Sequence, residues 1–220
     1  MNNRVEVLRG LFNYPYYTYK LKDTEHVPGV GKNATLLIIL SGLVFGLSAY
    51  FGIGSEYLSK KLTSISREEY EMHKLLFMAG QTILGLVFGA IMIFLPALFF
   101  WTLSDLELRK LLTIQFFVLP IFLFEKLIWI PLALSLGLTQ VSSPFALGTI
   151  AQYLTGNDFI IYFFATISMF KVWAILIEYK YLKMLTEKKP KVVMLMVVGI
   201  NLIIWLFSSL ISFIQFDKIL

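Results

Sequence analysis

One apolar stretch, residues 111–137, carries two adjacent charged residues near its middle, Glu125 and Lys126. The stretch is long enough to cross a bilayer, because roughly 20 helical residues rising about 1.5 Å each cover the hydrocarbon core. A charge at that depth costs at least ~2.5–3.5 kcal/mol when it faces lipid. Both side chains must therefore face protein or a water-filled cavity, and other membrane spans must surround this one.

Two prolines, Pro120 and Pro131, flank these charges. A proline inside a helix lacks a backbone donor and frees the carbonyl four residues earlier, so neighbouring helices or water must supply partners for those groups. We predict helix breaks at both positions. The need for partners is a second reason to expect that this span is enclosed by others.

The composition is that of a membrane protein. Of the 220 residues, 58% are hydrophobic and 15% are charged, whereas an average soluble domain is about 25% charged. The absence of cysteine excludes disulfides, thiolate catalysis and cysteine-ligated metal. The net charge of +5 includes no long block of Lys and Arg, so we interpret it as asymmetry between loops and predict no nucleic-acid partner.

The chain is predicted to form a single all-α integral membrane domain over residues 1–220. Residues 1–33 are mostly polar, and within them residues 2–13 have the pattern of an amphipathic helix that lies on the membrane surface. Tyrosines that follow it favour the headgroup level. Five membrane-spanning helices are then expected, at residues 34–53, 75–101, 112–136, 159–177 and 192–213.

Two connecting segments contain signals for further helices. Between the first two spans, Ser66 and Glu69 have the spacing of a capping box, which predicts a short helix. Residues 138–158, after the third span, contain no Lys or Arg. Ser143 and Pro144 suit the start of a helix there, and we expect it to be half-immersed or re-entrant.

The distribution of basic residues predicts the orientation. Five Lys and Arg residues lie in the N-terminal segment, two lie between the second and third spans, and five lie between the fourth and fifth. The opposite side carries five. Because the basic excess marks the cytoplasmic side, the chain is predicted to lie in the cytoplasmic membrane with its N-terminus inside and its C-terminus outside.

The pentapeptide GLVFG occurs in both of the first two spans, with Gly42 and Gly46 in one and Gly85 and Gly89 in the other. Glycines four residues apart lie on one helix face and let two backbones approach closely. We predict that these four residues form packing faces. The alternative is that they reflect only the general frequency of glycine in membrane helices.

The charged residues inside the spans are the candidate functional residues: Glu125, Lys126, Lys171 and Glu178. Glu125 and Lys171 lie in antiparallel neighbouring spans, and a bridge between them is feasible because a lysine side chain reaches several ångströms along a helix. Glu178 follows Lys171 by seven residues and shares its face. One interpretation is a buried relay or substrate site, and the other is a structural ion pair.

Enzyme signatures are absent from the sequence. No HExxH, GxSxG or HxxEH pattern occurs, and the two histidines, His26 and His73, fall on opposite predicted sides of the membrane. We therefore predict no catalytic residues, no metal site and no cofactor.

Three short motifs resemble those of the bacterial Yip-domain family of five-span membrane proteins. They are the opening Gly10-Leu11-Phe12-Asn13-Tyr14-Pro15-x-x-Thr18, the stretch Leu108-Arg109-Lys110-Leu111-Leu112-Thr113 leading to Leu119-Pro120, and Phe170-Lys171-Val172-Trp173. The motif residues are Asn13, Pro15 and Trp173. The resemblance implies five spans, a cytoplasmic N-terminus and a non-enzymatic role; some bacterial members are accessory subunits beside ABC-type exporters in resistance to peptide toxins.

Two functions follow as hypotheses. The first is a non-catalytic accessory or scaffold protein that contacts the bilayer and another membrane protein, such as an ABC exporter subunit, or a second copy of itself, in toxin or envelope-stress resistance. The alternative is a small secondary transporter or channel that uses Glu125, Lys126 and Lys171. Neutralising these charges should abolish transport and leave partner binding intact, which separates the two hypotheses.

Overall fold

The computed structural model describes residues 10–11, 13–24, 27–55 and 66–214. Helices make up the regular structure of these ranges, apart from one isolated antiparallel bridge between Ala146 and Ser168. The all-α prediction is thereby confirmed for this part of the chain. In chain order the helices are α2 (Tyr14–Asp23), α3 (Val30–Tyr50), α5 (Arg67–Leu103), α6 (Leu108–Leu136), the 3₁₀ helix η1 (Gln140–Ser142), α7 (Gly148–Leu154), α8 (Asp158–Ala165), α9 (Met169–Leu185) and α10 (Pro190–Ile214).

Four helices, α3, α5, α6 and α10, are long and apolar enough to cross a membrane. They coincide with four of the predicted spans. Only 33–39% of the most apolar window of each helix is buried inside the protein, and the remaining apolar surface is what lipid would cover. The four apolar helices indicate a multi-pass membrane protein.

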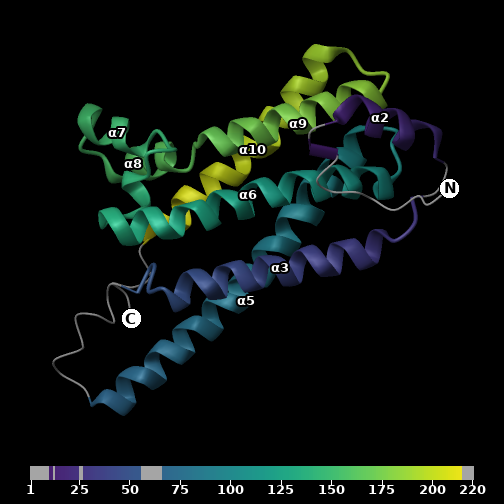
Figure 1. The fold of residues 1–220 in the computed structure, drawn as a ribbon. Helices are drawn as coiled ribbons and strands as arrows, with labels where there is room; N and C mark the ends of the chain where they lie inside the picture. Colours follow the sequence, from purple (N-terminus) through teal and green to yellow (C-terminus); the bar gives the residue numbers. More distant parts are fainter. Residues whose placement is uncertain (1–9, 12, 25–26, 56–65, 215–220) are drawn as a thin grey trace.

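Helix α6 lies at the centre of the fold and packs against α3, α5 and α9. Every residue from Leu111 to Leu119 is buried, so the first half of α6 is enclosed on all sides. In Figure 1, α3, α6 and α10 run in one direction and α5 and α9 in the other. This enclosed stretch ends before Pro120, and Glu125 and Lys126 in the second half of α6 are half-buried.

Helix α6 continues through Pro120 and Pro131, where breaks were predicted. Each proline removes one hydrogen bond, and the intervening turns keep the rest of the helical ladder. Helix α6 ends at Leu136, and Gly137 follows it in the left-handed conformation (φ 61°).

The prediction of a single helix over residues 159–177 is wrong. Helix α8 ends at Ala165, and α9 begins at Met169 and continues to Leu185. Ser168 caps α9 by accepting a hydrogen bond from the Lys171 backbone N–H (3.3 Å). The backbone between the two helices instead pairs with a distant loop, through hydrogen bonds of 3.0 Å from Leu147 N to Ile167 O and from Met169 N to Phe145 O.

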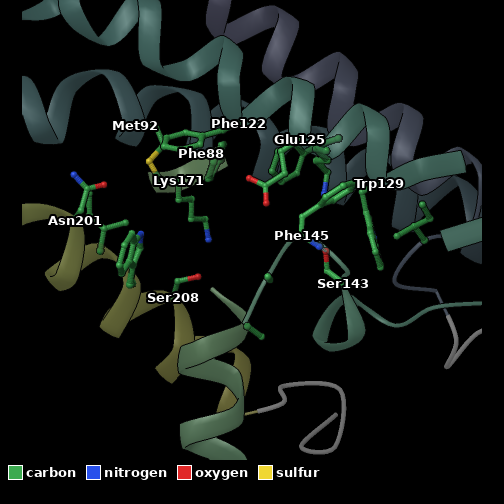
Figure 2. A pocket seen from close by; sticks show the side chains of 17 residues that line it. Phe88, Met92, Phe122, Glu125, Trp129, Ser143, Phe145, Lys171, Asn201 and Ser208 are labelled. Carbon is green, nitrogen blue, oxygen red and sulfur yellow. Dashed lines mark hydrogen bonds between the residues drawn. The ribbon is translucent and has the colours of Figure 1, made fainter. Parts of the chain in front are cut away.

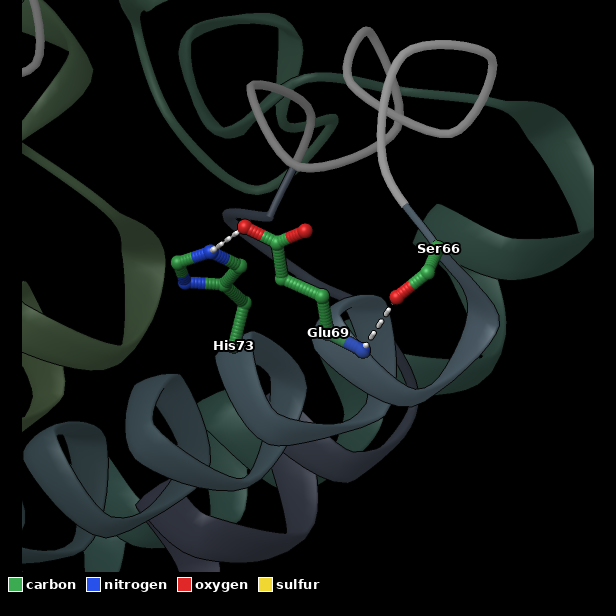
Figure 3. Close-up of polar contacts among 3 residues, drawn as sticks. All are labelled: Ser66, Glu69 and His73. Carbon is green, nitrogen blue, oxygen red and sulfur yellow. Dashed lines mark hydrogen bonds and ion pairs between the residues drawn. The ribbon is translucent and has the colours of Figure 1, made fainter.

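Helix α5 begins at the predicted capping site (Figure 3). The Ser66 hydroxyl accepts a hydrogen bond from Glu69 N (3.2 Å), and the Glu69 carboxylate lies 3.9 Å from His73 Nε2. This cap starts a 37-residue helix and not the short one expected. At about 55 Å, α5 is longer than the roughly 30 Å hydrocarbon core of a bilayer. Its charged first turns would therefore extend beyond the hydrocarbon.

The predicted amphipathic helix at residues 2–13 lies almost wholly outside the described residues. The first helix that follows, α2, contains Pro15 in its first turn. Tyr17 is 3% exposed and packs edge-on against Phe117 with a centroid distance of 5.8 Å. The Tyr181 hydroxyl donates to Gly10 O (2.8 Å). The N-terminal segment therefore packs against α6 and α9, although Tyr16 and Tyr19 remain exposed.

The helix expected at Ser143-Pro144 begins later, at Gly148, with Leu147 in the cap position. Residues 143–147 remain irregular because the Ser143 hydroxyl accepts from Phe145 N (3.4 Å) and Leu147 N bonds to Ile167 O. This loop, with η1, α7 and α8, forms a small layer at the end of the bundle where α6 ends (Figure 1).

Candidate functional site

A cavity of about 220 Å³ lies inside the bundle. Its walls come from α3, α5, α6, α9 and α10, and Ile53, the loop carrying Ser143 and Phe145, and Ala165 also line it. Ile53 and the loop follow the ends of α3 and α6, so the cavity lies in that half of the bundle. Six aromatic residues contribute to its lining: Phe45, Phe88, Phe122, Trp129, Phe145 and Trp205.

Three of the four predicted charged residues, Glu125, Lys126 and Lys171, line this cavity. Glu125 and Lys171 point into it from α6 and α9 (Figure 2). Within the described residues, no direct ion pair joins these two side chains. The predicted bridge is thus replaced by two opposite charges that share one cavity.

Each lysine of the cavity is held by an uncharged group. The Lys171 ammonium donates to the backbone carbonyl of Thr166, a carbonyl that the break between α8 and α9 leaves accessible. The Lys126 ammonium lies over the Phe45 ring, 4.0 Å from its centroid, where the ring's negative face attracts a cation. Two amino groups and one carboxyl group therefore line the cavity, and neither amino group is in direct contact with a carboxylate among the described residues.

Glu178 lies outside the cavity and is only 2% exposed. It accepts a hydrogen bond from the Asn201 side-chain nitrogen (2.8 Å), which also donates to Val197 O (3.0 Å). Gln115 of α6 lies beside the same carboxylate. Asn201 also lines the cavity, so it separates Glu178 from the cavity.

The four GLVFG glycines lie between α3 and α5. A Cβ atom built on Gly85 would lie 2.6 Å from Phe45 Cβ and 2.9 Å from Ser41 O, and one on Gly42 would lie 2.7 Å from a Leu86 methyl carbon. Gly46 and Gly89 are similarly close to α5 and α3. The Ser41 hydroxyl donates to Gly85 O (2.7 Å) across this interface.

Of the family-motif residues, Lys171 lines the cavity, whereas Asn13, Pro15 and Trp173 are not among its lining residues. Asn13 and Pro15 are exposed at the start of α2. Trp173 is half-buried on α9 and packs against the core. Within the described ranges, no group of three or more His, Asp and Glu side chains is placed to hold a metal ion.

Sequence reasoning missed the polar atoms that complete the cavity. Ser143, Ser208 and Asn201 line it, and Thr166 supplies the carbonyl that holds Lys171. The Ser143-Pro144 dipeptide was the one local signal for the loop, and it indicated a helix start instead of a cavity wall.

Comparisons of the chain with protein-family models, with curated proteins and with solved structures found no match. The resemblance to the Yip-domain family therefore stays a prediction based on its short motifs.

Proposed function

We propose that this protein is a small membrane transporter that binds an organic anion in the cavity of its helical bundle. The observation that carries the proposal is the meeting of Glu125, Lys126 and Lys171 at one cavity with aromatic walls. Charged side chains inside a membrane bundle are costly and commonly mark substrate pathways. Here they converge on one cavity.

The chemistry of the cavity favours a ligand with an acidic group and an apolar body. Two ammonium groups exceed one carboxylate, and both ammonium groups are held by partners that an anion could replace. The aromatic side chains would contact the apolar part of the ligand. A volume of about 220 Å³ is below the ~300–1,000 Å³ of pockets for drug-sized ligands, so the ligand is small.

We further propose five membrane crossings, with the N-terminus cytoplasmic. The 17 residues of α9 extend about 25 Å, and α9 runs antiparallel to α6 and α10. With α8 it would complete the fifth crossing. The basic residues before α3, in the first turn of α6, and between α9 and α10 would then lie on the cytoplasmic side, and the cavity would lie in the outer half.

The topology can be tested because the chain has no native cysteine. A cysteine introduced at the exposed position Lys189 should react with impermeant thiol reagents only from the inside, and one at the exposed Gly156 only from the outside. Labelling of both from the same side would contradict five crossings.

The accessory role beside an ABC-type exporter is the second proposal, and it has less support from the geometry. The glycine faces that suggested contact with a partner are occupied within the chain, between α3 and α5. An accessory subunit needs no ligand in its cavity. Partner recovery by affinity purification should be unchanged by Lys171→Met if the protein is accessory, whereas transport should be lost if it is a transporter.

Ligand binding is testable in nanodiscs by the fluorescence of Trp129 and Trp205, which line the cavity. Octanoate and benzoate should quench this fluorescence, and the matched amines and amides should not. Lys171→Met should weaken binding of the anions about 10-fold or more, since a hydrogen bond to a charged group contributes about 1.5–3 kcal/mol. Glu125→Gln should tighten it by removing a repulsive charge.

Two outcomes would contradict the proposal. Equal quenching by acids, amines and amides would mean that the cavity does not select charge. The second outcome is that Glu125→Gln binds a zwitterion more weakly than the wild type and binds simple acids equally well. This result would assign the cavity to zwitterionic ligands. Flux of the bound acid into proteoliposomes then distinguishes a transporter from a binding protein.

A further inference from the structure

A second polar site lies deeper in the bundle, where three helices each contribute one buried polar side chain. Glu178 on α9, Asn201 on α10 and Gln115 on α6 are 2%, 7% and 0% exposed. Asn201 donates to Glu178, and Gln115 lies beside the same carboxylate. A carboxyl group so thoroughly removed from solvent must be ionised with a compensating cation or else carry a proton.

Among the described residues, the side chains around Glu178 provide no such cation. Asn201 faces it from α10 and Gln115 from α6, and both are neutral amides. Tyr17 on α2 and Tyr181 on α9 are the ionisable groups toward the other end, where Tyr181 bonds to Gly10 O. The charged groups toward the cavity are Lys171, Lys126 and Glu125, and Lys171 is bonded to Thr166 O.

Gln115 supplies an independent indication of what Glu178 carries. Neither its side-chain oxygen nor its nitrogen has a hydrogen-bond partner among the described residues, although both atoms are buried. Buried polar atoms are paired in the large majority of cases, so an orphan calls for an explanation. A protonated carboxyl has one O–H donor. It can donate to the Gln115 oxygen while its other oxygen continues to accept from Asn201.

We propose that Glu178 is a proton-binding site that exchanges its proton with the cavity past the side chain of Asn201. Asn201 both bonds to Glu178 and lines the cavity, so a change of its rotamer would let cavity water reach the carboxyl. At the other end, Phe117 and Tyr181 stack at 5.0 Å and Gly10 covers them, which closes that route. The site does not depend on the anion proposed for the cavity.

The test is infrared spectroscopy of the intact protein in nanodiscs, because a protonated carboxylic acid has a carbonyl band that a carboxylate lacks. The wild type should show an acid band at neutral pH that decreases as the pH rises. Glu178→Gln should lose this band, and the matched control Glu125→Gln should keep it. In heavy water the band should shift, and Asn201→Ser, with a shorter side chain, should speed that exchange several-fold.

Asn201→Leu keeps the test decisive if Glu178→Gln fails to fold. It leaves the carboxyl in place and removes its donor, so the acid band should move to the frequency of a carboxyl with one hydrogen bond fewer. The proposal is overturned if the wild type shows no acid band, if Glu178→Gln retains the band, or if Asn201→Leu leaves the frequency of the band unchanged. Stabilisation by Na⁺ without an acid band would assign the site to a cation instead.

Because no ligand enters this experiment, its outcome is separate from that of the anion-binding experiment. An acid band without anion binding would leave the proton site standing and remove the transporter. Anion binding without an acid band would support the transporter and contradict the proton site.

Discussion

Two interfaces hold this bundle together by different means. Between α3 and α5, glycines let the backbones touch, and the Ser41 hydroxyl bonds to Gly85 O across the contact. Where α6, α9 and α10 meet, three large polar side chains, Gln115, Glu178 and Asn201, are buried among apolar ones, and a cavity lies beside Asn201. Both are recognised ways for helices to associate in lipid, where no hydrophobic effect drives them together.

The difference indicates where function resides. The α3–α5 interface is filled, and its polar atoms are paired locally. Among the described residues, the interface around α6 contains a buried amide without a hydrogen-bond partner, a carboxyl group without a cation, and three ionisable side chains that line a cavity. Such groups reduce stability unless something binds to them. The tightly packed pair would thus serve as a rigid wall for the polar region.

The largest effect is expected from Gly85→Leu. The new side chain would overlap Phe45 and the Ser41 carbonyl, and overpacking against backbone that cannot move should cost about 3 kcal/mol. Thermal unfolding in detergent measures this. Gly80→Leu is the matched control, because Gly80 lies on the same helix with nothing within 4 Å of its added Cβ. Equal melting of the two variants would mean that the glycine contact does not hold α3 to α5.

A smaller loss is expected in the polar region from Asn201→Leu. This change removes the donor to Glu178 and should cost about 1–3 kcal/mol, the penalty for leaving a buried partner unsatisfied. Chemical denaturation in nanodiscs is the measurement. Ser208→Ala, which alters an exposed residue of the cavity on the same helix, should change stability by less than about 0.5 kcal/mol. A similar loss of stability in both variants would mean that the substitutions act through the cavity and not through the hydrogen bond to Glu178.

A double-mutant cycle on Glu125→Gln and Lys171→Met should give a coupling energy of about 1 kcal/mol in thermal stability. The two charges share a cavity without touching among the described contacts, so the 3–5 kcal/mol typical of breaking a buried pair is not expected. A coupling of 3 kcal/mol or more would indicate direct contact. One within about 0.5 kcal/mol of zero would mean that the charges are independent.

The smallest effect should come from Lys126→Met, because Lys126 links the two regions only through the Phe45 ring. Loss of a partly exposed cation–π contact should cost about 0.5–1 kcal/mol. Lys126→Arg keeps the cation and should melt like the wild type. If the arginine variant is as unstable as the methionine variant, then the ammonium is held by something other than the ring.

The sequence by itself determined the elements whose formation is local. Long apolar runs predict α3, α5, α6 and α10, because in lipid every backbone group must be paired inside its own helix. The GLVFG pentapeptides indicated which face of α3 and α5 permits close approach, and the charges of α6 indicated that other helices enclose it. The same depth argument singled out Glu125, Lys126, Lys171 and Glu178.

Only the tertiary structure decided how these residues meet. The predicted span at residues 159–177 divides because its backbone pairs with residues 145–147, some twenty positions earlier. Lys171 bonds to a carbonyl exposed by that division, and Glu178 finds Asn201 on another helix. Such contacts depend on how each helix is rotated and shifted against its neighbours. Helix period and composition set which face a residue occupies, but the packing of several helices sets what that face touches.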